Sequence, residues 1–578
     1  MWRSVPVRPD ATLLAGLVAA LLLASAAVAQ PVPPAGGGAA TPAATGNGTT
    51  APAAASPALE SPALGPLSGR DTPLVVRPAP GGTLPGFAST APGLGVAGIT
   101  TPFDPGNRAF AIRPSIGVDV LATDNLFQTR QDARSDIVTT IAPSIEAAIA
   151  TPRMSGVLRY TPALRLYATY SNQDGIDQTG DGQFLAALVP SVLYLDMRGS
   201  ARVLPSTPGQ IPGAGQTIAG SSTMQTYTAQ VTPFLVHRFG SAASAQLGYS
   251  FQYSQQNWAD FSNSGLDGST SNFTAHRGFA VVRSGEDLGR LALQARTDST
   301  WYVGDGIYED AHHFIAALEA RYAILPSVAV LGEIGYENQQ YGGTSPLSID
   351  DAIWSVGLRL TPRPDSIVIV RYGHHDGFSS FSLNAGVALG VRTDFFASYR
   401  DSIGTSLTYG QDLLATTTTD SLGNPVDSQS GAPVVLINSF LGLSNTLYRL
   451  RIGEVSLRHR WPRDSFILSG TWQSQDPITS ADNAQIVGSS TGIYATFNWA
   501  HEFSPRTSGV GTVQYGRTNL GQVGTGDADI YALTATLMHQ LSEQLTASIQ
   551  VAWTTNTSSL PGQGYTQGVI RAGFRRTF

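Results

Sequence analysis

Residues 565–578, at the end of the chain, read YTQGVIRAGFRRTF and carry the strongest indication of the fold class. In an extended strand successive side chains point to opposite faces, so Ile570, Phe574 and Phe578 share one face and Arg571 lies on the other. A period of two is typical of a β-strand that separates an apolar from a polar environment. The sequence therefore predicts a C-terminal strand with one apolar and one charged face.

This terminal strand resembles the C-terminal signature that bacterial outer-membrane proteins present to their barrel-assembly machinery. The resemblance rests on Ile570, Phe574 and Phe578, and it implies that these residues are the assembly signal and that the machinery is a partner of the chain. Arg576 departs from the pattern, because an apolar or aromatic residue is usual at its position. Its long side chain can extend to the lower membrane interface.

The same alternation extends back through the chain to about residue 110. Near its start, Ile112, Ile116 and Val118 share one face, while Arg113 and Asp119 share the other. The alternating segments are about ten or more residues long, which is enough to cross a bilayer when a strand is tilted. A soluble β-sandwich usually has shorter strands. The pattern therefore predicts membrane-spanning strands.

The connections between these segments alternate between short links and longer polar loops, as in outer-membrane barrels. Counting the segments predicts an all-β fold, one large antiparallel transmembrane β-barrel of about 22 strands, within a range of about 18 to 22. An even number of strands places both the N-terminus and the C-terminus in the periplasm. The longer loops are expected at residues 124–134, 171–181, 205–222, 258–270, 342–349, 410–443, 477–486, 520–526 and 558–564.

The composition supports this fold class and excludes several others. Charged residues make up 13% of the 578 residues, against about a quarter in an ordinary soluble domain. Beyond the N-terminus, no segment approaches the roughly 18 apolar residues that a membrane-spanning helix needs. The chain has no Cys, which excludes disulfides and thiolate metal ligands, and its net charge of −7 gives no indication of nucleic-acid binding.

Three regions are expected along the chain. Residues 1–29 have the organisation of a secretory signal peptide, with a positively charged start, an apolar stretch and an A-x-A cleavage motif at 27–29. Residues 30–105 are rich in Pro, Ala and Gly and are predicted to be a disordered periplasmic tail, too poor in apolar residues to form the globular plug of a TonB-dependent transporter. Residues 106–578 are predicted to form the barrel.

The segments IRPSI at 112–116, TDNLF at 123–127 and LVPS at 188–191 are similar to the opening of the β-barrel porin type 2 family. The resemblance covers about residues 105–578 and implies a barrel in the Gram-negative outer membrane, in contact with its lipid. Its motifs are strands and turns, so they imply fold and location rather than an activity. Some members are associated with exopolysaccharide or exosortase-type systems, which implies polysaccharide-secretion components as partners.

Charged residues opposite the apolar faces are predicted to line the barrel lumen. In a channel, opposed charges set a transverse field and an ion preference. The other interpretation is that these residues form ion pairs that fill a wet lumen and have no role in selectivity. The candidates are Arg159, Arg165, Asp196, Arg198, Arg202, Glu319, Arg321, Arg359, Arg449, Arg451 and Arg571, joined by the same rule by Arg575, Asp119, Asp136, Glu146 and Glu333.

The segment 410–443 is too long for an ordinary connection, and it contains an apolar patch at 434–437 inside a polar frame. One interpretation is a loop folded into the lumen as a constriction, because a barrel of this size would otherwise leave a wide hole. The other interpretation is an outer loop that packs on its neighbours, or a further short strand.

Two pairs of adjacent histidines, His312-His313 and His374-His375, raise the question of a metal site. Adjacent side chains of a strand point to opposite faces, so neither pair can chelate one ion by itself. The sequence therefore predicts no metal and no cofactor, with the histidines at membrane interfaces or loop bases. Aromatic residues near strand ends are interpreted as interfacial girdles, namely Trp301, Tyr302, Trp354, Trp472 and Trp553.

Three hypotheses of function are compatible with this fold. The first is a porin-like channel for small polar or anionic solutes, with an Arg-rich lumen. The second is the outer-membrane component of an exopolysaccharide export system. The third is a barrel enzyme, which we do not expect, because neither G-x-S-x-G nor another recognisable catalytic motif stands in a convincing context, and no catalytic residue is assigned.

Overall fold

The computed structural model describes residues 109–205, 219, 223–258, 271–363, 366–405, 407–409, 417–419, 425–427, 446–481, 489–520, 526–559 and 564–578. The predicted signal peptide (1–29) and periplasmic tail (30–105) lie outside these residues, as does most of the predicted loop 410–443. Within that loop, β16 (Thr417–Thr419) and β17 (Pro425–Asp427) pair as a separate two-stranded sheet.

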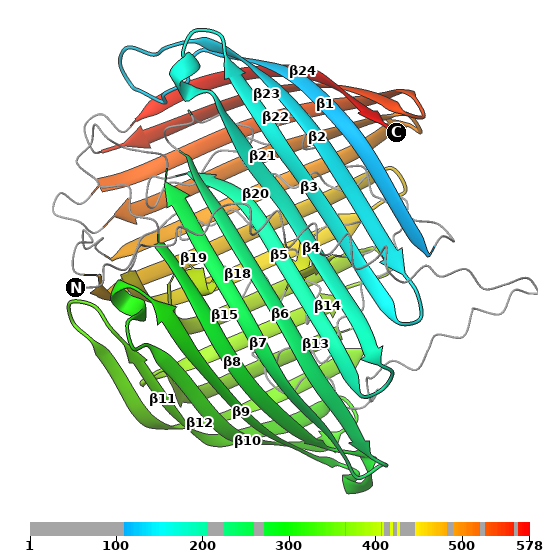
Figure 1. The fold of residues 1–578 in the computed structure, drawn as a ribbon, viewed down its shortest axis with the longest axis vertical. Coiled ribbons are helices and arrows are strands. Elements are labelled where there is room, and N and C mark those ends of the chain that lie inside the picture. The colour runs from blue at the N-terminus through cyan, green and yellow to red at the C-terminus, as the bar shows by residue number, and fades with distance from the viewer. Residues whose placement is uncertain are drawn as a thin grey trace, which may run out of the picture. The chain divides into compact units, whose positions relative to one another are not determined.

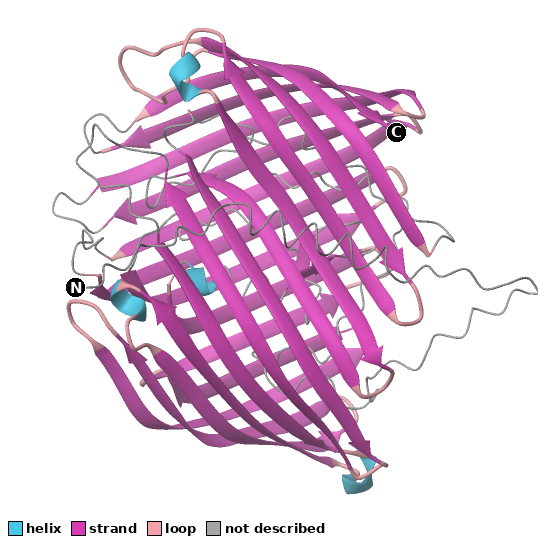
Figure 2. Ribbon diagram, in the orientation of Figure 1, coloured by secondary structure: helices cyan, strands magenta, loops and turns pink. Residues whose placement is uncertain are grey.

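In the described chain, 22 strands form one antiparallel sheet that closes on itself (Figures 1 and 2). Each strand pairs with the next, and the first pairs with the last from Ser115↔Thr577 to Thr123↔Val569. The predicted antiparallel barrel and its strand number are confirmed. The strands are β1 (Phe110–Thr123), β2 (Asp136–Ala150), β3 (Met154–Tyr167), β4 (Gly175–Val189), β5 (Leu193–Pro205), β6 (Thr223–Phe239), β7 (Ala243–Trp258), β8 (Ser271–Ser284), β9 (Leu291–Gly304), β10 (His312–Leu325), β11 (Val328–Tyr341), β12 (Leu347–Arg363), β13 (Ser366–His375), β14 (Phe378–Ala388), β15 (Thr393–Gly404), β18 (Thr446–Arg460), β19 (Asp464–Ser480), β20 (Ser490–Ser504), β21 (Thr507–Leu520), β22 (Gly526–Ser542), β23 (Leu545–Ser558) and β24 (Tyr565–Thr577).

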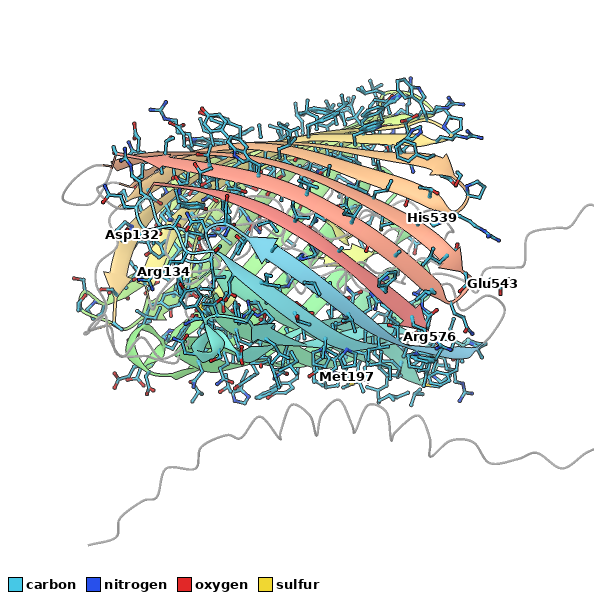
Figure 3. All side chains as sticks on the ribbon, turned by 90° about the horizontal axis from the view of Figure 1, so that it is seen from above. Asp132, Arg134, Met197, His539, Glu543 and Arg576 are labelled. Carbon is cyan, nitrogen blue, oxygen red and sulfur yellow. The ribbon has the colours of Figure 1, made fainter. Side chains whose placement is uncertain are left out.

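The two ends of the barrel differ in the length of their connections. Figure 3 places Glu543, in the short β22–β23 turn, at the same end as Arg576, and places Asp132 and Arg134, in the long β1–β2 connection, at the opposite end. We refer to the end with Asp132 as the outer end. Two predicted loops are shorter than expected, because β4 already begins at Gly175 and β19 continues to Ser480.

One outer connection breaks the predicted alternation of long and short links. β13 and β14 are joined by Asp376 and Gly377 alone, whose φ angles of 54° and 74° are those of a two-residue hairpin turn. Asp-Gly adopts this turn readily, because Asp tolerates a positive φ and Gly has no Cβ to oppose it. The β13–β14 hairpin is therefore a compact feature of the outer end.

The outer face of the barrel is apolar along the strands. Val120, Leu533 and Val551 are examples of aliphatic side chains that are exposed on this face. Exposed aromatic residues accompany them: Phe110, Phe239, Trp461, Phe503 and Phe578 near the end with the short turns, Trp354 and Trp472 near mid-strand, and Trp301 and Trp553 nearer the outer end. A belt of this kind suits a hydrocarbon environment with aromatic residues at its borders.

The residues of the predicted assembly signal lie on this outer face. Ile570, Phe574 and Phe578 are 58%, 56% and 62% exposed, while Arg571 between them is buried on the inner face. The Arg576 guanidinium lies 5.2 Å from the centroid of the Phe578 ring, on the same outer face. The alternation predicted for the last strand is thus present, and the recognition of these residues by an assembly machinery stays a prediction. Among the residues that the structure describes, no helix is long and apolar enough to span a membrane.

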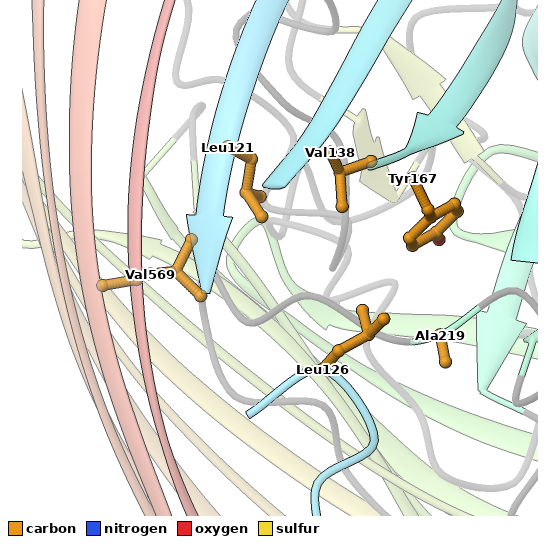
Figure 4. Packing of buried hydrophobic residues seen from close by; sticks show 7 residues of the cluster. Leu121, Leu126, Val138, Tyr167, Ala219 and Val569 are labelled. Carbon is orange, nitrogen blue, oxygen red and sulfur yellow. The ribbon is translucent and has the colours of Figure 1, made fainter. Parts of the chain in front are cut away.

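An apolar cluster fills the inner side of the closing seam towards the outer end (Figure 4). Leu126, which lies in the β1–β2 connection, is completely buried in it. The connection is anchored by Asn125, whose side-chain amide donates a hydrogen bond to the Thr566 carbonyl at 2.9 Å. The cluster consists of Leu121, Leu126, Val138, Tyr167, Ala219, Ala552 and Val569.

The seam between β14 and β15 has a short ladder. The two strands pair only from Leu383↔Tyr399 to Ala388↔Asp394, whereas β15 pairs with β18 along its whole length, from Thr393↔His459 to Gly404↔Tyr448. The outer part of β15 therefore follows β18 and separates from the β13–β14 hairpin.

We expect the closing seam to depend on Gly573. It pairs with Asp119 of β1, and a Cβ at this position would lie 2.6 Å from the Asp119 Cβ and 2.6 Å from the Val118 carbonyl oxygen. Gly573→Val should destabilise the barrel by about 1–3 kcal/mol, the usual cost of overpacking. Urea unfolding in lipid vesicles measures this. The control is Gly278→Val on β8, where no atom lies within 4 Å of the added Cβ, and equal stability of both variants would contradict the expectation.

Candidate functional site: the charged lumen

A buried glutamate lies between two arginines on the inner face of the first strands. The carboxylate of Glu146 on β2 accepts a hydrogen bond from Nε of Arg113 on β1 at 2.8 Å. Its Oε1 lies 3.6 Å from Nε of Arg159 on β3. Both arginines are the direct cross-strand neighbours of Glu146 in the register. Charge therefore connects these three strands in addition to the backbone hydrogen bonds.

The same arrangement recurs on β3 to β5. Nη2 of Arg165 lies 2.8 Å from Oδ1 of Asp177 on β4. On β5, Nε of Arg198 lies 2.9 Å from Oδ1 of Asp196, two residues earlier on the same face. Arg202 lies on that face as well, because it follows Arg198 on the same strand by an even number of positions. The structure thus brings Asp196 and Arg198 together as an ion pair within one strand.

A denser network covers the inner face from β9 to β13. Glu319 on β10 is buried and forms an ion pair with Arg371 on β13. Glu333 on β11 accepts a hydrogen bond from Nη2 of Arg296 on β9 at 2.7 Å, and its other oxygen lies 3.9 Å from Nη1 of Arg371. Arg321 is buried on the same face of β10 as Glu319. Two carboxylates and two arginines therefore link four of the five consecutive strands from β9 to β13.

Arg359 also faces the lumen, on β12. It pairs in the register with Ala329 of β11, which is buried on the inner face, while its chain neighbours Leu358 and Leu360 are exposed on the outer face. Arg321 and Arg359 thus contribute two guanidinium groups to the inner wall, one strand apart from each other.

The closing seam carries further charged contacts. Nε of Arg571 on β24 lies 3.6 Å from Oδ2 of Asp119 on β1, and both side chains are buried. Arg575 donates a hydrogen bond from Nη2 to the Ser115 hydroxyl at 2.9 Å. Asp136, at the outer end of β2, accepts hydrogen bonds from backbone N–H groups of the β3–β4 connection, so it holds that connection in place.

Two predicted lumen residues lie on the other face. Arg449 and Arg451 share a face of β18 with Val455, which is exposed on the outside, while Leu450 and Ile452, which alternate with them, are buried inside. The physical reason is that Tyr409 packs on these apolar residues from within the barrel, which reverses the usual assignment of apolar and charged faces. The prediction that Arg449 and Arg451 line the lumen is therefore corrected.

On the outer face these two arginines form ion pairs with aspartates. Nη2 of Arg449 lies 2.7 Å from Oδ2 of Asp401 on β15, and Nη2 of Arg451 lies 2.5 Å from Oδ2 of Asp476 on β19. The guanidinium of Arg449 also lies 3.8 Å from the centroid of the Phe378 ring, at the start of β14. Arg449 thus spans the place where β14 and β15 separate.

The sequence reasoning missed several inner-face charges that the same rule would have found. Arg371 alternates with Val370 and Tyr372, so its parity already placed it opposite an apolar face. The partners of the missed residues lie on neighbouring strands, which a single segment cannot reveal. The missed inner-face residues with ion pairs are Asp177, Arg277, Arg296, Asp298, Arg371, Asp394 and Arg458.

At the outer end, the connection that follows β15 turns into the barrel. Leu407 is buried in a cluster with Phe273 on the inner face of β8 and with Tyr308 of the β9–β10 connection. The Tyr308 hydroxyl lies 2.5 Å from the Thr405 hydroxyl, and burial raises the pKa of Tyr308, so its hydroxyl stays neutral. Leu407 thus lies inside the outer mouth, whereas most of the predicted loop 410–443, with its apolar patch 434–437, lies outside the described residues, so the constriction interpretation stays a prediction.

The β11–β12 connection also reaches across the outer mouth. The backbone N–H of Thr344 donates to the Ser480 carbonyl of β19 at 2.8 Å, and that of Ser345 donates to the Thr479 hydroxyl at 3.2 Å. β19 is not a sheet neighbour of β11 or β12, so these hydrogen bonds bridge the mouth. Tyr302, predicted as part of the membrane girdle, instead packs inside with Phe273 and the other aromatic residues of the mouth.

The histidines of each adjacent pair separate as predicted, one to each face. Nε2 of His312 contacts Oδ1 of Asn338 on the outer side at 2.6 Å, whereas His313 faces the lumen. His374 contacts Asp351, whereas His375 faces the lumen near the β13–β14 turn. The two inward histidines lie beside the same pair of carboxylates, a combination that neither sequence pair reveals.

Comparison with known proteins gives similarity to solved barrel structures at low identity. The siderophore receptor PiuA of Acinetobacter baumannii aligns with a TM-score of 0.44 and 9% identity, over 80% of this chain and 81% of that chain. The ferric-catecholate import receptor Fiu of E. coli K12 gives 0.43 and 10%, over 84% and 85%. The outer-membrane protein OpdK of Pseudomonas aeruginosa gives 0.31 and 8%, over 81% and 99%. No family model and no curated protein matches the sequence, so the fold assignment rests on the strand register and closure.

We expect the buried Glu319–Arg371 pair to contribute strongly to stability. Arg371→Ala leaves the buried Glu319 carboxylate without this cation, which should cost about 3–5 kcal/mol. The control is Arg517→Ala, whose partner Asp527 is exposed, and which should cost far less, because water screens an exposed ion pair. Chemical unfolding in lipid vesicles measures both.

A second variant separates the charge from the packing at this position. The double variant Glu319→Leu with Arg371→Leu removes both charges and should recover most of the loss, since replacing a buried pair by apolar residues is often neutral. If Arg371→Ala were as stable as Arg517→Ala, the pair would not hold the inner wall together.

Proposed function

We propose that this chain is an outer-membrane channel of the porin-like kind for small polar or anionic solutes, with both termini on the periplasmic side. The observation that carries the proposal is the contrast between the two faces of one closed wall. The outer face is apolar and the inner face carries buried polar and charged side chains. A wall of this kind gives a polar solute a route that avoids hydrocarbon.

The outer-membrane location is supported by the closed sheet and by the sequence. A closed barrel satisfies its backbone hydrogen bonds between strands, which is a condition for crossing a bilayer. The predicted signal peptide at 1–29 would direct the chain out of the cytoplasm, and the predicted assembly signal would recruit the barrel-assembly machinery. The resemblance of 105–578 to the β-barrel porin type 2 family points to the same location.

The preference for anionic solutes is argued from the inner arginines. Carboxylates such as Glu146 and Asp177 are already bound to arginines, so their negative charge is balanced within the wall. Arg321 and Arg359 add positive charge to the inner face between β10 and β12. Charge in a pore of restricted width favours ions of the opposite sign.

Single-channel recording of the full mature chain in a planar bilayer tests the proposal. In a salt gradient, we expect a reversal potential of the sign that indicates anion preference. Replacing Arg321 and Arg359 together by Ala should lower the anion-to-cation permeability ratio at least about twofold. Arg451→Ala is the matched control, because this residue shares a strand face with Val455, which is exposed on the outer side, and it should leave the ratio unchanged.

The outcomes separate the hypotheses. Equal effects of the inner and outer arginines would refute a role of the lumen charges in selectivity. A protein shown to be folded by heat-dependent gel migration, yet silent in every recording, would refute the channel itself. Such a result would favour the export component, and loss of surface polysaccharide in a deletion strain would then be the measurement to make.

A further inference from the structure

Four potential metal ligands meet at the outer end of the lumen. His313 on β10, Glu337 on β11 and Asp376 of the β13–β14 turn place one ligand atom each within 4.8 Å of one another. Nδ1 of His375 on β13 lies 3.6 Å from Oε2 of Glu337 and 3.4 Å from Oδ1 of Asp376. Both carboxylates are buried, with side-chain exposures of 0% and 3%.

The fold builds this cluster from three separate elements. His313 pairs with Gln339 in the β10–β11 register, so Glu337 is the next inward residue of β11. The two-residue turn with positive φ then carries Asp376 from β13 towards β11. Because the turn consists of Asp376 and Gly377 alone, Asp376 stays close to the strands, and its side chain contacts Gln339 on the inner face of β11. The outer connections on either side of this turn, residues 342–346 and the connection after β15, are longer.

The carboxylates are already oriented by groups of the protein. Nε2 of Gln339 donates a hydrogen bond to Oδ1 of Asp376 at 2.6 Å, and the backbone N–H of Ile403 donates to Oδ2 at 3.3 Å. The backbone N–H of Gly377 donates to Oε1 of Glu337 at 3.2 Å. Hydrogen bonds of this kind fix the orientation of metal-binding carboxylates in established sites.

We propose that His313, Glu337, His375 and Asp376 bind one divalent transition-metal ion of the zinc type. Two imidazoles and two carboxylates are a ligand set that suits Zn²⁺ and its first-row neighbours, whereas Ca²⁺ and Mg²⁺ take oxygen ligands. Ligand atoms about 2.0–2.2 Å from a tetrahedral ion lie roughly 3.4 Å from one another. The separations of His375 Nδ1 from the two carboxylates, 3.6 and 3.4 Å, match this value. The ligand atoms of His313, Glu337 and Asp376 lie within 4.8 Å of one another, so side-chain rotations that draw them closer would complete the site.

The ion would connect the β13–β14 hairpin to β10 and β11 from within the lumen. The outer part of this hairpin has no backbone ladder with β15. The metal ion would therefore hold the hairpin in place where backbone hydrogen bonds to β15 are absent. Metal binding would then stabilise the outer mouth and would not require any solute. The inference is independent of the proposed channel function.

Zinc binding to the full, tag-free protein tests the proposal. After removal of metal with a chelator, titration calorimetry should give one Zn²⁺ per chain, and added Zn²⁺ should raise the temperature of unfolding. Glu337→Gln and Asp376→Asn keep the side-chain shape and should each weaken the affinity at least about tenfold. His313→Ala should do the same, and Co²⁺ in place of Zn²⁺ should give the visible absorption of a tetrahedral site in the wild type only.

The neighbouring histidines are matched controls. His312→Ala and His374→Ala remove an imidazole one residue away from each ligand, on the opposite face of the same strand, and should bind Zn²⁺ like the wild type. Variants count only when heat-dependent gel migration shows a folded barrel. If the folded wild type binds no stoichiometric Zn²⁺, or if the carboxylate variants and the histidine controls bind it equally, the proposed site is wrong.

Discussion

The constraint on which this structure depends is that backbone N–H and C=O groups find no partners in hydrocarbon. A sheet satisfies them only when it has no free edge, so the pairing of β1 with β24 is the condition for every other feature of the wall. The strict alternation of apolar and polar residues follows, because each strand then has one face towards lipid and one towards the lumen. Gly573 and Asp119, at this seam, show how closely the first and last strands approach each other.

The inner face adds a second level of organisation. Its charged residues are held in contacts between neighbouring strands, as in the group of Glu146 with Arg113 and Arg159. These ion pairs help to hold each long strand beside its correct neighbours. The same side chains determine the charge of the lumen. In the proposed channel, the same residues would therefore serve both stability and selectivity. Paired arginines hold the wall, and the guanidinium groups on the inner face would set the charge that a solute meets.

The sequence predicts the features that depend on one strand at a time. Alternation within single strands predicts the fold and the inward placement of Arg159, Arg321 and Arg571, and counting the alternating segments predicts the strand number. It failed for Arg449 and Arg451, because their assignment depends on Tyr409, which lies on a connection outside the strands and covers the apolar side chains of β18 from inside. The grouping of His313 with Glu337 and Asp376 was equally out of reach, since it depends on a turn that brings three distant segments together.

The short ladder between β14 and β15 changes what the sequence can tolerate. Along most of the wall, backbone hydrogen bonds hold the strands, so one aliphatic residue on the outer face can replace another with little effect on the neighbouring strand. Outside the pairs Leu383↔Tyr399 to Ala388↔Asp394, side chains take over this task, through Arg449 with Asp401 and the Phe378 ring. At this position the cohesion of the wall depends on the identity of individual side chains and no longer on the backbone, which is the same for every residue.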